Sequence, residues 1–284
     1  MNRRDFLATS AAVLGGCAMG PDAGPAVGRE HLLTGLAAFS RPADWSAGHH
    51  GAALIAGYYF CRENAVDERT ARSVRRNLDE YVARNADAFP ARADGRAVAA
   101  ERIAETLRES IGHYRAGGHD AIYAAMALKA LKDAPEMAVA PVVDGVCALL
   151  RDFVRRFPGL PGCDGYRDKL DLARRTCETI LRRGPFRGSG HVVTHADALL
   201  TLSECGFADL ARLGYAAHAR HVCEREGESA ARVVRWTEAS HWDSDAARRP
   251  RGSWSVGHAF KFPYSLLRLA RRAGDPALAL CDVR

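Results

Sequence analysis

Residues 118–131 read GHDAIYAAMALKAL, a Gly-His pair that opens a segment rich in Ala and Leu. The same opening recurs at residues 190–202, GHVVTHADALLTL, and at residues 257–267, GHAFKFPYSLL. Such segments are typical of helices, because Ala and Leu favour helix and the alternation of β-branched residues that marks a strand is scarce. The recurring opening therefore predicts several equivalent helices.

A fourth opening is the His49-His50 pair, which follows a glycine one residue out of step with the others. When His50, His119, His191 and His258 are placed in register, they lie 69, 72 and 67 residues apart. Intervals this similar indicate an internal repeat of about 70 residues. Each repeat is expected to hold the Gly-His helix, a second helix and often a third.

Four further segments carry apolar residues at every third or fourth position: 69–85, 97–114, 138–157 and 166–183. That spacing predicts amphipathic helices with one face on a core. We therefore expect an all-α protein of helical-hairpin repeats, closed or partly closed into an α/α toroid. In a ring, the Gly-His helices form the inner layer and their N-terminal ends converge at one mouth. An open solenoid would instead spread them along a concave surface.

The composition is that of a folded chain. Of 284 residues, 48% are apolar, and 40 Lys and Arg against 34 Asp and Glu give a net charge of +6. This apolar share excludes an intrinsically disordered protein. The basic residues are interleaved with acidic ones and lack aromatic neighbours, so we expect no nucleic-acid partner. Residues 31–284 are expected to form a single α-helical domain.

The N-terminal sequence MNRRDFLATSAAVLGGC resembles a twin-arginine export signal, with Arg3 and Arg4 followed by Phe-Leu and a short apolar run. Its Leu-Gly-Gly-Cys end resembles a lipobox, in which Cys17 is lipidated; a cysteine that is not lipidated is the alternative. The resemblance implies that residues 1–17 are read by the twin-arginine export machinery. Residues 18–30 are expected to be a flexible tether. The protein would then be lipid-anchored to a membrane on the periplasmic side of a bacterial cell envelope.

Seven cysteines follow Cys17, and none forms a Cys-x-x-Cys pair. Their spacing excludes a zinc knuckle and a thioredoxin-type motif. We expect most of them to be buried thiols that pack as small apolar side chains. One or two disulfides in an oxidising compartment are the alternative, and the sequence leaves their pairing open.

The Gly-His openings carry the candidate catalytic residues, which are His50, His119, His191 and His258. A helix N-terminus presents unpaired N–H groups and a partial positive charge, which favour anionic groups and disfavour a protonated imidazole. A histidine there tends to stay neutral, the form that accepts a proton or binds a metal ion. Acid–base chemistry and metal binding both remain open for these residues.

One metal-ligand pattern lies inside the third opening, where His191 and His195 form an HxxxH pair. Residues four apart share a helix face, so both imidazoles can reach one ion. His119 and Asp120 are the candidates to complete the site, the carboxylate either as a ligand or as the hydrogen-bond partner of one. Imidazole and carboxylate donors suit Zn, Fe, Mn or Cu, and the sequence does not choose among them.

Further residues near the openings are expected to line the same cavity: His49, Asp197, His241, Trp242, Trp254 and Lys261. The two tryptophans flank an Arg- and Gly-rich stretch, residues 246–253, which we interpret as a long loop leading to the last opening. His218 and His221 lie in a segment rich in Arg and Glu and are expected to be exposed.

The last opening, Gly257-His258-Ala259-Phe260-Lys261, continues to Leu266-Leu267 and the turn Gly274-Asp275-Pro276. This segment is similar to part of the N-acylglucosamine 2-epimerase group. Proteins of that group are α/α toroids in which a histidine opening a helix is an acid–base residue. The resemblance covers only residues 257–276 and implies the toroid rather than the epimerase reaction, since Lys261 stands where the group tends to have Glu.

Two classes of function remain open at this point. An enzyme acting on a small molecule, through a His-bound metal or through histidine acid–base chemistry, requires that the imidazoles meet around one cavity. A non-catalytic helical-repeat scaffold, which binds a partner or an envelope ligand, requires only that the repeats pack. The direction in which the imidazoles point distinguishes the two.

Overall fold

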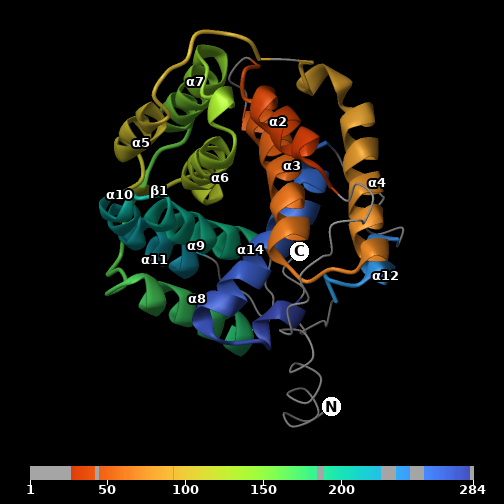
Figure 1. The fold of residues 1–284 in the computed structure, drawn as a ribbon. Coiled ribbons are helices and arrows are strands. Elements are labelled where there is room, and N and C mark those ends of the chain that lie inside the picture. Colours follow the sequence, from red (N-terminus) through yellow and green to blue (C-terminus); the bar gives the residue numbers. More distant parts are fainter. Residues whose placement is uncertain are drawn as a thin grey trace.

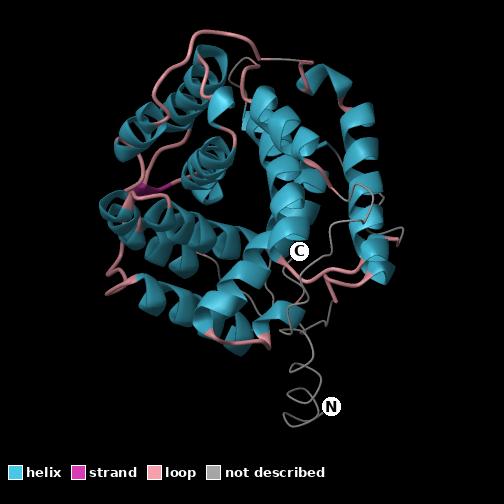
Figure 2. Cartoon of the chain, in the orientation of Figure 1, coloured by secondary structure: helices cyan, strands magenta, loops and turns pink. Residues whose placement is uncertain are grey.

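The computed structural model describes residues 27–41, 45–91, 93–183, 189–224, 235–243 and 253–281. Within these ranges the chain is helical, apart from loops and one antiparallel pair of two-residue strands, β1 (His113–Tyr114) and β2 (Leu160–Pro161) (Figure 2). The all-α class expected from the sequence is therefore confirmed. The export signal, Cys17 and the side chain of Trp254 lie outside the described residues.

The helices follow one another as α2 (Arg29–Ala38), α3 (Trp45–Glu63), α4 (Glu68–Arg84), α5 (Glu101–Arg108), α6 (His119–Asp133), α7 (Ala140–Arg156), α8 (Lys169–Arg183), α9 (Ser189–Glu204), α10 (Ala208–Leu213), α11 (Tyr215–Cys223), α12 (Ala239–Trp242) and α14 (Ser253–Ala273). Short 3-10 turns cover Ala86–Ala88, Ala116–Gly118, Pro135–Met137 and Leu278–Leu280.

Four of these helices, α3, α6, α9 and α14, form the interior, and we call them the inner helices. Helix α3 contacts α6, α6 contacts α9, α9 contacts α14, and α14 contacts α3 again. Each carries a Gly-His opening near its N-terminal end, at the first residues of α6 and α9 and about one turn into α3 and α14. Their described side chains are buried almost all the way round, as is typical of a helix inside a protein. Figure 1 shows them in the middle of the molecule, with α4, α5, α7 and α8 at the periphery.

The glycines of the openings let the inner helices approach one another closely. A Cβ added to Gly48 would lie 2.3 Å from the ring of Tyr123 on the next inner helix. One added to Gly118 would lie 2.5 Å from the ring of His195 on α9, and the φ of Gly118, +77°, is itself unfavourable for other residues. The Gly of the Gly-His motif is thus required by packing between neighbouring helices.

The peripheral helices have the predicted single apolar face. Helix α4 contacts α3 and α12, α7 contacts α5 and α6, and α8 contacts α9 and α14. Asp67 caps α4 by accepting a 2.6 Å hydrogen bond from the backbone N–H of Thr70. The helix predicted over residues 97–114 is shorter than expected, because the chain leaves it after Arg108 and pairs as strand β1.

The thiols are free in the structure, which describes all seven cysteines after Cys17. Two of them, Cys147 and Cys177, are buried, whereas Cys223 is exposed and the other four are half-buried, so the expectation that most are buried is wrong. Burial raises the pKa of the Cys61 thiol to about 12, so it stays protonated at neutral pH. None of the described helices has the length and apolar character needed to cross a bilayer.

Candidate functional site

The N-terminal ends of the inner helices bring four imidazoles together, one from each helix. The ring centroids of His49 and His119 lie 4.8 Å apart, as do those of His119 and His191. His258 closes the circuit, with centroid distances of 4.6 Å to His191 and 4.8 Å to His49. We call these four residues the imidazole cluster.

Three members of the imidazole cluster have the geometry of a metal-ligand group. His49, His119 and His258 are all buried, and each offers a ring nitrogen within 4.8 Å of those of the other two. Three imidazole nitrogens are a common ligand set for a catalytic zinc ion, and they also suit Fe, Mn or Cu. His191 is half-buried and packs its ring against the edge of this group.

The turn before α6 fixes the tautomer of His119. Ala116, Gly117 and Gly118 have φ values of +44°, +70° and +77°, which reverse the chain and place the Ala116 carbonyl beside His119 Nδ1. A carbonyl oxygen only accepts a hydrogen bond, so Nδ1 carries the proton and donates it. Nε2 then holds the lone pair, which is the arrangement of a histidine oriented for a metal ion.

The imidazoles of the metal-ligand group are held in their neutral form. Burial lowers the pKa of His49, His119 and His258 well below the ordinary value, and the repulsion that a second proton on Lys261 or a neighbouring imidazole would cause lowers it further. A neutral imidazole is the form that coordinates a metal ion. The donor set is thus both close enough and in the correct protonation state at neutral pH.

Lys261 lies one helical turn after His258 and is only 1% exposed. Its ammonium nitrogen lies 2.9 Å from His49 Nδ1 and 5.4 Å from the centre of the Tyr123 ring. Burial lowers the pKa of Lys261 to about 7. Lys261 therefore places an amine with a lowered pKa directly against the imidazole cluster.

A second group of histidines lies deeper along α9. His195 and His221 approach each other through their Nδ1 atoms at 3.2 Å. His218 contacts the Tyr166 hydroxyl at 2.9 Å and donates from Nε2 to the Val192 carbonyl at 3.1 Å. Burial lowers the pKa of His218 to about 4. These polar contacts make this second group a hydrogen-bonded part of the interior.

The expected exposure of His218 and His221 is wrong, because both are fully buried. Their helix, α11, carries Arg220 on one side and is followed by Glu224, but its other side packs against α9 and β1. The ring of Tyr114 from β1 stacks on His221 at a centroid distance of 4.6 Å. The composition of a short polar segment therefore does not reveal that one of its faces is buried.

In α3 it is His49, and not the predicted His50, that joins the imidazole cluster. His50 turns toward α4, where its Nδ1 lies 2.6 Å from the Tyr81 hydroxyl and its ring packs edge-on against Phe89. The sequence contained the signal, since Gly48-His49 is the Gly-His dipeptide itself and lies 70 residues before His119. The other three predicted catalytic histidines, His119, His191 and His258, are the ones the structure brings together.

The predicted metal set is divided between different surroundings. His191 packs against the imidazole cluster, whereas His195 packs against His218 and His221. Asp120 is buried, and its carboxylate accepts a 2.9 Å hydrogen bond from the backbone of Ala121. His119 is the one residue of that predicted set that belongs to the metal-ligand group among the described residues.

Two of the remaining candidates pack away from the imidazole cluster. Trp242 is 1% exposed, stacks on Phe260 and donates a 2.7 Å hydrogen bond to the Trp236 carbonyl. His241 lies edge-on to Trp236 at 4.6 Å. The short helix α12 therefore packs against α4, and its aromatic residues contribute to the core.

The opposite end of the inner helices carries a network of matched charges. Arg268 donates to Asp197 at 2.8 Å, to Glu204 at 2.6 Å and to the Thr201 hydroxyl at 2.5 Å. Its Nε also lies 3.4 Å from Glu63. An open hollow of about 390 Å³ at this end is lined by Glu63, Lys129, Glu204, Arg268, Arg271 and Arg272.

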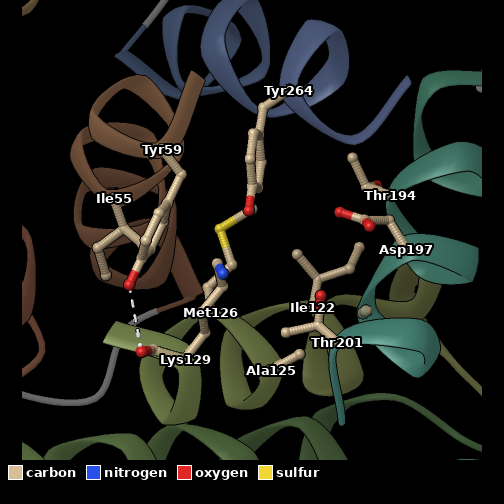
Figure 3. A pocket seen from close by; sticks show the side chains of 11 residues that line it. Ile55, Tyr59, Ile122, Ala125, Met126, Lys129, Thr194, Asp197, Thr201 and Tyr264 are labelled. Carbon is tan, nitrogen blue, oxygen red and sulfur yellow. Dashed lines mark hydrogen bonds between the residues drawn. The ribbon is translucent and has the colours of Figure 1, made fainter. Parts of the chain in front are cut away.

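Between the two ends, described residues of the inner helices enclose a small internal cavity. The internal cavity drawn in Figure 3 has a volume of about 10 Å³, enough for a single water molecule. Figure 3 shows Tyr264 and Met126 pointing toward each other across it, and Tyr59 donating to the Lys129 carbonyl at 3.2 Å. Asp197 lines this cavity, as expected, but is bound by Arg268.

Comparison with family models, with curated proteins and with solved structures gives no match to this chain. What the imidazole cluster does must therefore be inferred from its own chemistry.

Proposed function

We propose that this protein is a metal-dependent enzyme that acts on a small molecule, with His49, His119 and His258 as ligands. The observation that carries the proposal is the convergence of three buried ring nitrogens within 4.8 Å. A bound transition metal would supply a Lewis acid and an activated water molecule. His191 is placed at the edge of this group and, being more exposed than the other three, contacts the incoming substrate.

The proposed architecture is an α/α toroid of repeats of about 70 residues, because repeat units of this size stack their helices against their neighbours. The closed circuit of contacts among α3, α6, α9 and α14 supports it. So does the position of each clustered histidine directly after a glycine, within the first two turns of its helix. In such a ring, the imidazole cluster occupies one mouth and the Arg268 network the other.

We further propose that the enzyme is a lipoprotein of the bacterial cell envelope, on the periplasmic side. The support is the N-terminal twin-arginine motif with Arg3 and Arg4, and Cys17 at the end of the apolar run. A protein that folds around a metal before export acquires the ion in the cytosol. That order of events suits a ligand group as buried as His49, His119 and His258.

A non-catalytic scaffold is the less favoured function. Repeat packing alone explains why the helices contact each other, but it gives no reason for three buried imidazoles to face one point. Neutral apolar side chains would pack there without the cost of removing polar nitrogens from water.

The deciding experiment measures metal content in protein folded in the cytosol without its export signal. We expect close to one equivalent of Zn, Fe, Mn or Cu by plasma mass spectrometry. The variants His49→Ala, His119→Ala and His258→Ala should each lose the metal while keeping their helical circular dichroism. His113→Ala, which changes an exposed histidine on β1, is the matched control. Wild-type protein without bound metal, and unable to bind added Zn²⁺ or Co²⁺, would overturn the proposal.

A further inference from the structure

The open hollow at the C-terminal end of the inner helices is lined by charged side chains alone. Its volume is about 390 Å³, and the residues around it are Glu63, Lys129, Glu204, Arg268, Arg271 and Arg272. A hollow of this size has room for a small molecule, unlike the internal cavity of about 10 Å³. Most small-molecule sites are mainly apolar, so an entirely charged lining indicates a charged ligand.

Three of the four cations around this hollow already have a carboxylate partner. The pairs are Lys129 with Glu63 at 2.7 Å, Arg268 with Asp197 at 2.8 Å and Arg272 with Glu204 at 2.5 Å. Arg271 is the fourth cation, and its guanidinium donates to the amide oxygen of Asn64, a neutral group. Among the described residues, no carboxylate forms an ion pair with Arg271. One positive charge in the hollow is therefore unmatched.

Arg271 shares one face of α14 with Arg268 and Arg272, because the three lie three and four residues apart. Like charges at this spacing repel each other. Glu204 pairs with both Arg268 and Arg272 and so offsets their repulsion. Within the described ranges, no carboxylate pairs with both Arg268 and Arg271 in this way. The C-terminal dipole of α14 supplies only about half an elementary charge, so an anion beside Arg271 would stabilise this face.

The N–H donors around the hollow suit a phosphate group. A guanidinium has five N–H donors and an ammonium group has three. The bond to Asn64 uses one donor of Arg271, and the pair with Glu63 uses one donor of Lys129. A tetrahedral phosphate group presents at least three oxygens and can accept from several of the remaining donors at once, whereas a carboxylate has two oxygens in one plane.

We propose that this hollow binds the phosphate group of a small molecule, with Arg271 as its main ligand and Arg272 and Lys129 at its sides. Arg268 is only 3% exposed and forms the buried wall of the site. The site lies at the opposite end of the inner helices from the imidazole cluster. The phosphate site therefore does not rest on the proposed metal-dependent activity.

The test titrates inorganic phosphate and acetate into the purified protein at constant ionic strength, with calorimetry as the readout. We expect saturable binding of phosphate, and acetate should bind at least about tenfold more weakly. Arg271→Met should weaken phosphate binding at least about tenfold, and because Arg271 is exposed, its circular dichroism should stay that of the wild type. Arg108→Met is the matched control. It changes an exposed arginine in the last turn of α5, away from the hollow, and should leave the phosphate Kd unchanged.

Two further arms locate the phosphate and identify its source. Treatment with EDTA should leave phosphate affinity unchanged, because the site needs no metal ion. Vesicles of phosphatidylglycerol that sediment the wild type but not Arg271→Met would assign the phosphate to a lipid headgroup. Vesicles that sediment neither protein would assign it to a soluble molecule, and either result supports a phosphate site.

Three results would overturn the inference. The first is wild-type protein that does not bind phosphate, and the second is acetate binding as tight as that of phosphate. The third is phosphate binding that EDTA abolishes and Arg271→Met leaves unchanged, which would place the phosphate on a metal ion at the imidazole cluster. That third result would refute the phosphate site while supporting the metal site, so the two proposals fail separately.

Discussion

At the C-terminal end of the inner helices, the buried cation Arg268 meets the carboxylates of Asp197, Glu204 and Glu63. At the N-terminal end, the buried amine of Lys261 contacts the imidazole of His49. The two residues lie on the same helix and are about equally buried. The matched network stabilises the packing of the helices, whereas the N-terminal end, where no carboxylate pairs with Lys261 among the described residues, retains buried polar groups at a cost in stability. Such a cost is commonly the mark of a functional site.

The largest effect should follow from breaking the matched end. Arg268→Met would leave Asp197 buried with no cation in hydrogen-bond range and would remove one partner of Glu204. Removing one member of a buried ion pair costs about 3–5 kcal/mol, and we expect that loss in the free energy of unfolding. Urea unfolding followed by circular dichroism measures it. Arg272→Met, a half-exposed partner of Glu204, is the control and should lose less than about 1 kcal/mol.

The next effect concerns the imidazole end and separates two adjacent histidines. His49→Ala should weaken Zn²⁺ affinity at least about 100-fold, which corresponds to roughly 2.7 kcal/mol, because a ligand is lost. His50→Ala should change the affinity less than about threefold, since His50 faces Tyr81 and α4. Competition with a chromogenic chelator gives both values. Equal losses in the two variants would contradict the assignment of His49.

Acid should destabilise the histidine-rich part of the protein selectively. Burial lowers the pKa of His218 from 6.5 to about 4 in the folded protein. Between these pH values the unfolded chain binds a proton that the folded chain does not. The free energy of unfolding therefore falls by about 1.4 kcal/mol per pH unit for this group as the pH decreases below 6.5. His49, His119, His195 and His258, whose pKa values burial also lowers, add to the same trend.

Urea unfolding at a series of pH values measures this slope. His218→Gln removes one titrating group and should make the slope shallower by about 1.4 kcal/mol per pH unit. His113→Gln, on exposed strand β1, should leave the slope as in the wild type. A slope that His218→Gln does not alter would show that burial of this histidine is not linked to stability.

The smallest effect is expected for Lys129→Met. Lys129 pairs with Glu63 at 2.7 Å and lies over the Tyr59 ring at 4.3 Å. Because Glu63 keeps Arg268 as a second partner, the loss should be at most about 1 kcal/mol. A fall in melting temperature as large as that of Arg268→Met would show that the matched end depends on the whole network rather than on Arg268.

The sequence predicted the helices well because their signals are local. The period of apolar residues in α4, α7 and α8 follows directly from one face packing on a core. The Ala- and Leu-rich character of α6 and α9 likewise indicated helices, and the structure adds that they are buried on all sides. Strands β1 and β2 were not predicted, since two-residue strands carry no period.

The site could be predicted only in part, because burial and direction depend on neighbouring helices. His49 and His50 are adjacent and both come after Gly48. The packing of α3 against α6 and α14 determines that His49 faces the imidazole cluster. The His191 and His195 pair shares a helix face, but four residues advance the helix by about 6 Å. His195 therefore reaches the level of α11 and meets His221 instead.

Helix α14 spans both ends of the interior. It carries His258 and Lys261 near its start and Arg268 ten residues after His258, a rise of about 15 Å along the helix. Pro263 lies between them and removes one internal hydrogen bond of α14. If a ligand that binds His258 displaces α14 along its axis, Arg268 moves with the helix. The ion pair between Arg268 and Asp197 would then change its geometry. Ligand binding at the imidazole cluster would thereby change the hollow that Arg268 lines at the opposite end.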